Sequence, residues 1–156
     1  MSPIWIAVIV FVVVVLVLGV VWRGNTLDKL EPLPDEALRF EEWGVRVKQV
    51  GHRPTLHLNC CVRVTNRRLI IGAKMLFSKQ HALLHIFELD GGPTGMDIGE
   101  TLKSGYVRGG VPRASIQLGQ EREQRYVEVP MHWLQRRLQL YCKEPDRCHA
   151  ALLAQP

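Results

Sequence analysis

The first 22 residues form an almost uninterrupted apolar run, and this run constrains the chain more than any other feature. It contains 19 hydrophobic residues and no charged side chain. As a helix, residues 4–22 would rise about 28 Å, close to the thickness of a bilayer's hydrocarbon core. Trp5 and Trp22 lie near its two ends, where aromatic side chains favour the membrane interface. The run therefore predicts a transmembrane anchor over residues 1–23.

A cleaved signal peptide is the competing interpretation of this run. Such a peptide needs a basic stretch before the apolar residues and a small-residue cleavage site after them. Only Met1, Ser2 and Pro3 precede the continuous apolar stretch of residues 4–22, and the sequence at its end, Trp-Arg-Gly-Asn at 22–25, is a poor cleavage site. The anchor is therefore expected to be retained.

The charges next to the run predict how the anchor is oriented. Arg23 and Lys29 follow it, and no basic side chain precedes it. Under the positive-inside rule, this arrangement places the rest of the chain in the cytoplasm. We therefore expect an integral protein of the cell's inner membrane, with one span and a cytoplasmic C-terminal domain.

The overall net charge of +5 hides a division of the chain. Residues 23–42 carry three bases and six acids, whereas residues 43–156 carry 17 bases and nine acids. Pro32 and Pro34 favour extended backbone between the two parts. The division predicts an acidic linker over residues 24–34 and one basic domain over residues 35–156.

Alternating apolar residues indicate that this domain consists mainly of β-strands. Apolar side chains occupy every second position from Leu56 to Val64, with polar ones between them, which is typical of a half-buried strand. Thr65-Asn66-Arg67 predicts a hairpin turn, and the glycines of residues 91–95 predict a loop. The spacing of strands favours a small antiparallel barrel or sandwich. The strands expected besides 56–64 cover 45–48, 68–71, 82–89, 106–108, 114–118, 126–129 and 138–142.

At the end of the chain, the spacing of the apolar residues changes from the alternation of a strand to the spacing of a helix. Pro145 and Asp146 suit the first turn of a helix, and Cys148, Ala151 and Leu152 would then share one face. One C-terminal helix that caps the strands is therefore expected. Two tryptophans, Trp43 and Trp133, are expected to be core or rim anchors.

Two segments of the domain resemble bacterial PH-like and GRAM-like domains. The segment Leu-Pro-Asp-Glu-Ala-Leu at residues 33–38 is similar to their opening motif, although Asp35 replaces the usual glycine. The segment from Val62 to Gly72, with Thr-Asn-Arg-Arg-Leu at its centre, resembles their central hairpin. The resemblance covers residues 33–154, except for residues 91–104, which do not align. It implies a bent barrel of seven strands under a C-terminal helix, in a family that mostly binds lipids, peptides or proteins and has no enzymatic activity.

Two patterns suggest chemistry, but neither is specific. His81 and His85 have the four-residue spacing of a metal pair on a helix, but on a strand they would lie about 13 Å apart on one face. No metal, other cofactor or catalytic residue is therefore expected. Cys61, which lies on the polar side of its strand, keeps open the alternative of a thiol- or metal-dependent hydrolase that acts near the membrane. The four cysteines lack the spacing of a disulfide framework and are expected to be buried free thiols: Cys60, Cys61, Cys142 and Cys148.

Basic residues near the expected hairpins are the main functional indication. If these hairpins converge, their side chains form a rim that binds anionic lipid headgroups or an acidic protein partner. Nucleic acid is not an expected partner, because no aromatic side chains accompany the bases. The sequence thus predicts a membrane-tethered binding module without enzymatic activity. The candidate anion-binding residues are Lys48, His52, Arg53, Arg67, Arg68, Lys74 and Lys79.

Overall fold

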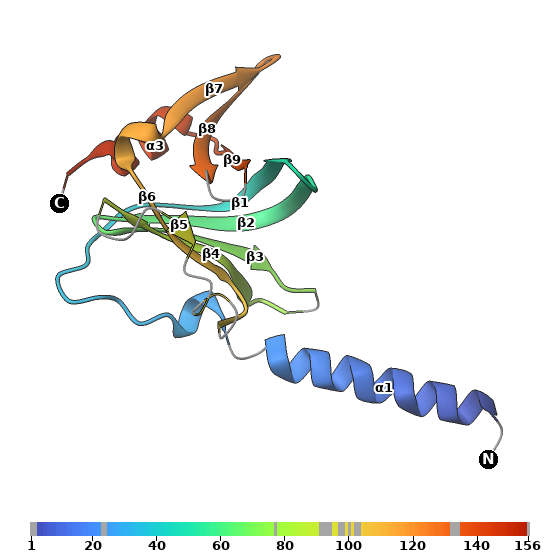
Figure 1. Cartoon of the computed structure of the whole chain (residues 1–156). Coiled ribbons are helices and arrows are strands. Elements are labelled where there is room, and N and C mark those ends of the chain that lie inside the picture. Colours follow the sequence, from blue (N-terminus) through green and yellow to red (C-terminus); the bar gives the residue numbers. More distant parts are fainter. Residues whose placement is uncertain are drawn as a thin grey trace.

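A computed structural model gives the fold of the chain (Figure 1). It describes residues 3–22, 25–76, 78–90, 95–96, 99, 101, 104–131 and 135–155, and the side chains of residues 17–22 and 95–96 are outside this description. Of the loop expected at residues 91–95, residues 91–94 lie outside the described residues and Gly95 belongs to a strand. The anchoring role expected of Trp133 also lies outside the described residues.

One curled sheet of nine strands, shaped as a half-barrel, forms most of the described structure. The strand order is β5-β6-β4-β3-β2-β1-β9-β8-β7, and all neighbours are antiparallel except β4 and β6. The first five strands in the chain are β1 (Leu38–Gly51), β2 (Thr55–Thr65), β3 (Arg68–Lys74), β4 (His81–Leu89) and β5 (Gly95–Met96). The other four are β6 (Val107–Val111), β7 (Gln117–Glu121), β8 (Gln124–Met131) and β9 (Arg136–Tyr141). Helices are α1 (Pro3–Trp22) and α3 (Pro145–Leu153), with short 3-10 turns η1 (Leu27–Lys29) and η2 (Arg113–Ser115).

The inner face of the half-barrel holds the larger core. Alternation along each strand directs every second side chain inward, and α3 adds Cys148 and Leu152 from its buried side. Burial of this apolar surface supplies the main stabilising free energy, at about 25 cal/mol per Å². The C-terminal helix and its buried face are therefore confirmed. Fully buried side chains on the inner face include Val45, Val62, Phe87, Val129 and Leu140.

A second, smaller core lies on the outer face, where the start of the expected linker packs against the sheet. Leu27 in η1 is only 1% exposed. It packs with Cys61, Ile70, Leu83 and Ile86 from β2, β3 and β4. The Leu83 N–H also donates a 3.0 Å hydrogen bond to the Asn25 carbonyl. Residues 25–30 are thus part of the folded unit.

The transmembrane anchor expected over residues 1–23 is wrong. Across the described residues, no helix combines the length and the apolarity that crossing a membrane requires. The expected placement as a single-pass protein of the inner membrane, with a cytoplasmic domain, is corrected for the same reason.

The expected fold class needs a further correction in its β part. The chain is mainly β and ends in a helix, as the sequence predicts. The strands, however, form one open half-barrel sheet. Its β4 and β6 run parallel, so the sheet is not wholly antiparallel. The expected strand at residues 114–118 begins only at Gln117, because η2 occupies residues 113–115.

Candidate anion-binding surface

The up-and-down path of β1 to β4 gives the half-barrel two different ends. The β1–β2 hairpin at residues 51–55 and the β3–β4 hairpin at residues 74–81 lie at one end, on the same side of Figure 1. The β2–β3 turn at residues 65–68 lies at the opposite end. We call the first end the basic end. It includes the start of β9, because Arg136 on β9 is paired with Gly51 at the end of β1. We call the second the paired end.

The structure therefore separates the seven predicted anion-binding residues. His52, Arg53, Lys74 and Lys79 are exposed at the basic end. Arg67 and Arg68 lie at the paired end, so they do not join the same rim. Lys48 is on the outer face of β1, where its amine is 3.1 Å from a carboxylate oxygen of Glu121 on β7.

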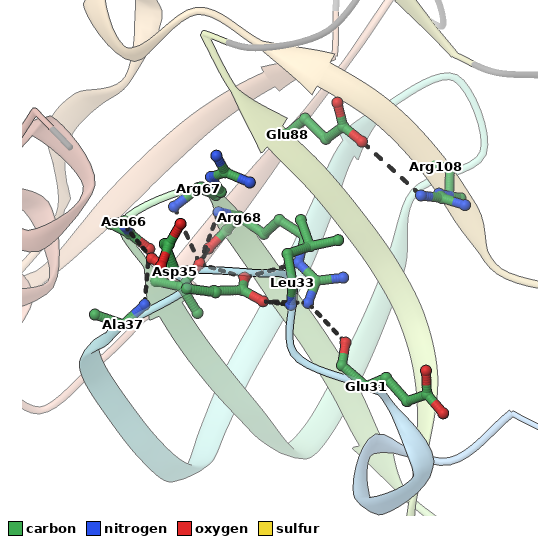
Figure 2. A network of polar contacts seen from close by, with 11 residues as sticks. Glu31, Leu33, Asp35, Ala37, Asn66, Arg67, Arg68, Glu88 and Arg108 are labelled. Atoms are coloured by element: carbon green, nitrogen blue, oxygen red, sulfur yellow. Dashed lines mark hydrogen bonds and ion pairs between the residues drawn. The ribbon is translucent and has the colours of Figure 1, made fainter.

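At the paired end, Arg68 is a structural residue with a carboxylate partner. It is only 4% exposed. Its Nε donates a 2.8 Å hydrogen bond to Glu36, and its Nη2 donates to the same carboxylate and to the Glu31 carbonyl. Figure 2 shows Arg68 beside Leu33 and Glu31, from the segment that leads into β1. Because the guanidinium is already neutralised and enclosed, Arg68 is unsuited to bind an external anion.

The carboxylate of Glu36 is held in its ionised form at this end. Burial by itself raises its pKa, but hydrogen bonds from Arg68, from the Leu33 N–H and from the Thr65 hydroxyl outweigh that effect and lower the pKa to about 2. The side chain of Asn66 continues the network by accepting from the Ala37 N–H at 2.9 Å and donating to the Asp35 carbonyl at 3.0 Å (Figure 2). The two motifs on which the family resemblance rests thus meet at the paired end.

A second buried arginine at the paired end, Arg113, also has a carboxylate partner. The Arg113 side chain is buried, and its Nε lies 2.9 Å from the Asp90 carboxylate. Its other nitrogens donate to the carbonyls of Leu152, Ala154 and Asn66. This arginine fastens α3 to the β2–β3 turn, so its charge also has a structural role.

The basic end has cations without matching carboxylates. Residues 43–87 and 129–143 contain no aspartate or glutamate, and both hairpins and the start of β9 fall within them. In the part of the chain that the structure describes, Arg137 reaches Glu128 at 3.6 Å. No ion pair is found there for the other five basic side chains, which are His52, Arg53, Lys74, Lys79 and Arg136.

Exposed apolar side chains accompany these cations. Leu76 in the β3–β4 hairpin is 87% exposed and lies between Lys74 and Lys79 in sequence. Leu56 and Leu58 at the start of β2 are also exposed. The basic end therefore offers both positive charge and apolar surface to a partner.

The two histidines with metal-like spacing lie on opposite faces of β4. A register shift between β3 and β4 makes Leu84 an extra residue, since Gly72 pairs with Leu83 and Ile71 pairs with His85. His81 stands beside Trp43 on the outer face, with ring centroids 4.7 Å apart, whereas His85 stacks on Phe87 inside. The expectation that His81 and His85 share one face is therefore wrong. In the described residues, no group of three or more His, Cys, Asp or Glu side chains could hold a metal ion.

His85 is the most perturbed imidazole in the described structure. It is 6% exposed, and burial lowers its pKa to about 3, with the nearby side chains of His57 and Arg136 adding to the effect. Sequence reasoning missed these three residues as a group. The signal that could have found the region was the absence of acids from residues 43–87 and 129–143.

The cysteines lack the environment of a nucleophile. All four are buried free thiols, as expected. Burial raises the pKa of Cys60 to about 11 and that of Cys61 to about 12, so both stay protonated near neutral pH. Cys61 is not exposed as its strand pattern suggested, because Leu27 covers it. These features give no support to the alternative of a thiol hydrolase.

Comparison with known proteins adds no further constraint, because the chain matches no family model, no curated protein and no solved structure.

Proposed function

We propose that this chain is a binding module without enzymatic activity, whose basic end docks onto an anionic lipid surface. One observation carries the proposal: two hairpins and the start of β9 bring basic side chains to one end of the half-barrel without an aspartate or glutamate among them. At the opposite end, comparable arginines have carboxylate partners. Unmatched exposed cations are free to neutralise the charge of a partner.

The make-up of the basic end supports a lipid surface in particular. Each exposed base close to an anionic surface contributes about 1 kcal/mol. Arg53, Lys74 and Lys79 are exposed on hairpin tips, which can approach a flat surface together. The exposed Leu76 between two of these bases would enter the boundary between headgroups and acyl chains. Charge and apolar surface thus favour the same partner.

The half-barrel is, in this proposal, a PH-like or GRAM-like domain. The β-rich half-barrel and its C-terminal helix are compatible with that assignment. The meeting of the two resembling motifs through Glu36, Arg68 and Asn66 also supports it. Function does not follow from fold alone, so the proposal is tested by lipid binding.

The test measures the affinity of the full chain for anionic lipid. The chain is kept in neutral detergent, because α1 exposes large apolar side chains, and phosphatidylglycerol or phosphatidylcholine is then added. We expect binding of the anionic lipid alone, weakened at high salt. Replacing two exposed cations in Arg53→Gln with Lys79→Gln removes about 2 kcal/mol, or about 30-fold in affinity.

A matched double variant serves as the control. Arg67→Gln with Arg147→Gln removes two exposed cations, one in the β2–β3 turn and one on α3, both away from the basic end. This variant should leave the affinity within about twofold. Equal losses in both double variants, or equal binding of both lipids, would overturn the proposal. Binding of soluble polyglutamate but of neither lipid would assign the basic end to an acidic protein partner instead.

A further inference from the structure

Three polar side chains from distant strands lie on the inner face near the basic end. His57 on β2 is paired with Val47, whose side chain is in the inner core. His85 on β4 shares its face with Phe87 and stacks on it at 5.5 Å. Arg136 on β9 has the same orientation as Leu138, two residues further along. The curl of the sheet brings them close enough for His57 and Arg136 to act electrostatically on His85.

Two of these side chains have buried polar atoms without a partner. Within the described residues, Nδ1 of His85 and Nε of Arg136 are inaccessible to solvent and make no hydrogen bond. The His85 residue is 94% buried, since 6% of its surface is exposed. Buried polar groups normally have a partner, so these two atoms on one face have hydrogen-bonding capacity that a ligand could use.

The surroundings of His85 have no compensating negative charge among the described residues. Its two strand neighbours, Ile71 on β3 and Val107 on β6, are apolar. The titratable groups that act on it are His57 and Arg136, and both are basic types. Arg136 is half-buried and has no carboxylate partner among the described residues, unlike the buried Arg68 with Glu36, so a bound anion would supply a counter-charge.

We propose that His57, His85 and Arg136 form a recessed site for one phosphate group, which is either part of a lipid headgroup or a free phosphate ester. The site rests on the proposed function and deepens it. The exposed cations of the basic end attract the anionic partner, and the recessed site holds one phosphate of it. Arg136 contributes fork-shaped donors that suit phosphate oxygens, and the imidazoles contribute single N–H donors.

Phosphate fits the donors better than a carboxylate does. Three side chains from three strands can each address a different oxygen of a tetrahedral phosphate. A carboxylate has only two oxygens for the same three donors. We therefore expect inorganic phosphate and glycerol phosphate to bind more tightly than acetate.

The experiment titrates inorganic phosphate, glycerol phosphate and acetate into the full chain, with calorimetry for affinity and imidazole NMR signals for location. We expect both phosphates to shift the ring signals of His57 and His85. Arg136→Gln should weaken phosphate binding by about tenfold or more, because a charge-assisted hydrogen bond is lost. The neighbouring Arg137→Gln is the matched control, since Arg137 points to the opposite face toward Glu128, and it should change affinity by less than about twofold.

His85→Phe separates binding from a purely structural role. Phenylalanine keeps an aromatic ring on Phe87 but removes the unsatisfied nitrogen. Weaker phosphate binding together with unchanged or increased thermal stability supports the site. A loss of stability with unchanged affinity, or equal effects of Arg136→Gln and Arg137→Gln, would overturn it.

The failure of this site can be distinguished from the failure of the proposed function. If the Arg53 and Lys79 variant loses lipid binding while no phosphate shifts the histidine signals, only the recessed site is refuted. If phosphate binds through Arg136 while anionic lipid gives no charge-dependent binding, the lipid-docking function is refuted and the site stands. Binding of glycerol phosphate and of anionic lipid at the same histidines identifies a headgroup as the source, whereas binding of inorganic phosphate alone identifies a free phosphate.

Discussion

Arginine side chains have different surroundings at the two ends of the half-barrel. At the paired end, Arg68 and Arg113 are buried against Glu36 and Asp90, and their remaining donors contact backbone carbonyls. At the basic end, Arg136 is half-buried but forms no ion pair among the described residues. The half-buried arginine without a counter-charge is therefore the one to which we assign an external anion.

This difference shows why basic residues cannot be assigned a role from their charge alone. The sequence predicts one anion-binding rim that contains both Arg68 and Arg53, yet Arg68 is enclosed and Arg53 is exposed. The distribution of acids separates the two cases. Glu36 and Asp90 lie where the buried arginines need them, and the segments at the basic end contain none.

The largest effect is expected from breaking the buried pair at the paired end. Glu36→Gln keeps the shape of the side chain but leaves the Arg68 guanidinium buried without a counter-charge. Removing one partner of a buried ion pair costs about 3–5 kcal/mol, so the free energy of unfolding should fall by that amount. Chemical denaturation measures it. Lys74→Gln at the basic end is the control and should stay within about 0.5 kcal/mol of the parent, and equal losses in both would contradict the division into two ends.

Acid should weaken the paired end in a defined pH window. The pKa of Glu36 falls from 4.5 to about 2 on folding, so its contribution to stability is present above pH 4.5 and is lost as pH falls toward 2. A shift of that size corresponds to about 3 kcal/mol. Denaturation curves at successive pH values should show this loss, and Glu36→Gln should show a smaller one. A parent chain and a Glu36→Gln variant with identical pH profiles would refute the role given to this carboxylate.

Near the basic end, removing one buried side chain is expected to raise the free energy of unfolding, by less than the changes at Glu36 lower it. His85→Phe removes a buried nitrogen that has no partner, and an unsatisfied buried group costs about 1–3 kcal/mol. We expect the free energy of unfolding to rise by about 1 kcal/mol. A fall of similar size would show that His85 is a satisfied structural residue.

Much of the fold could be predicted from local patterns. The alternation from Leu56 to Val64 gave a strand, Thr65 to Arg67 gave a turn, and Pro145 began a helix, because each depends on neighbouring residues. The open sheet and the parallel pair of β4 and β6 could not be predicted, since they depend on contacts between residues distant in sequence. The transmembrane prediction failed although it rested on a strong local pattern.

The candidate site was less predictable than the fold. His81 and His85 fall on opposite faces because of the extra residue at Leu84, and nothing in the apolar run around it shows that irregularity. Likewise, the burial of Cys61 depends on Leu27, which is 34 positions away in the sequence. The inner cluster of His57, His85 and Arg136 joins strands that are neighbours only through the curl of the sheet.

The most direct test of the contrast between the two ends is a residue-resolved NMR titration of the full chain with phosphatidylglycerol in neutral detergent. The account predicts salt-sensitive shifts of the backbone signals of residues 51–55 and 74–76, with residues 65–68 unchanged. Shifts of equal size at both ends, or shifts confined to residues 65–68, would contradict it.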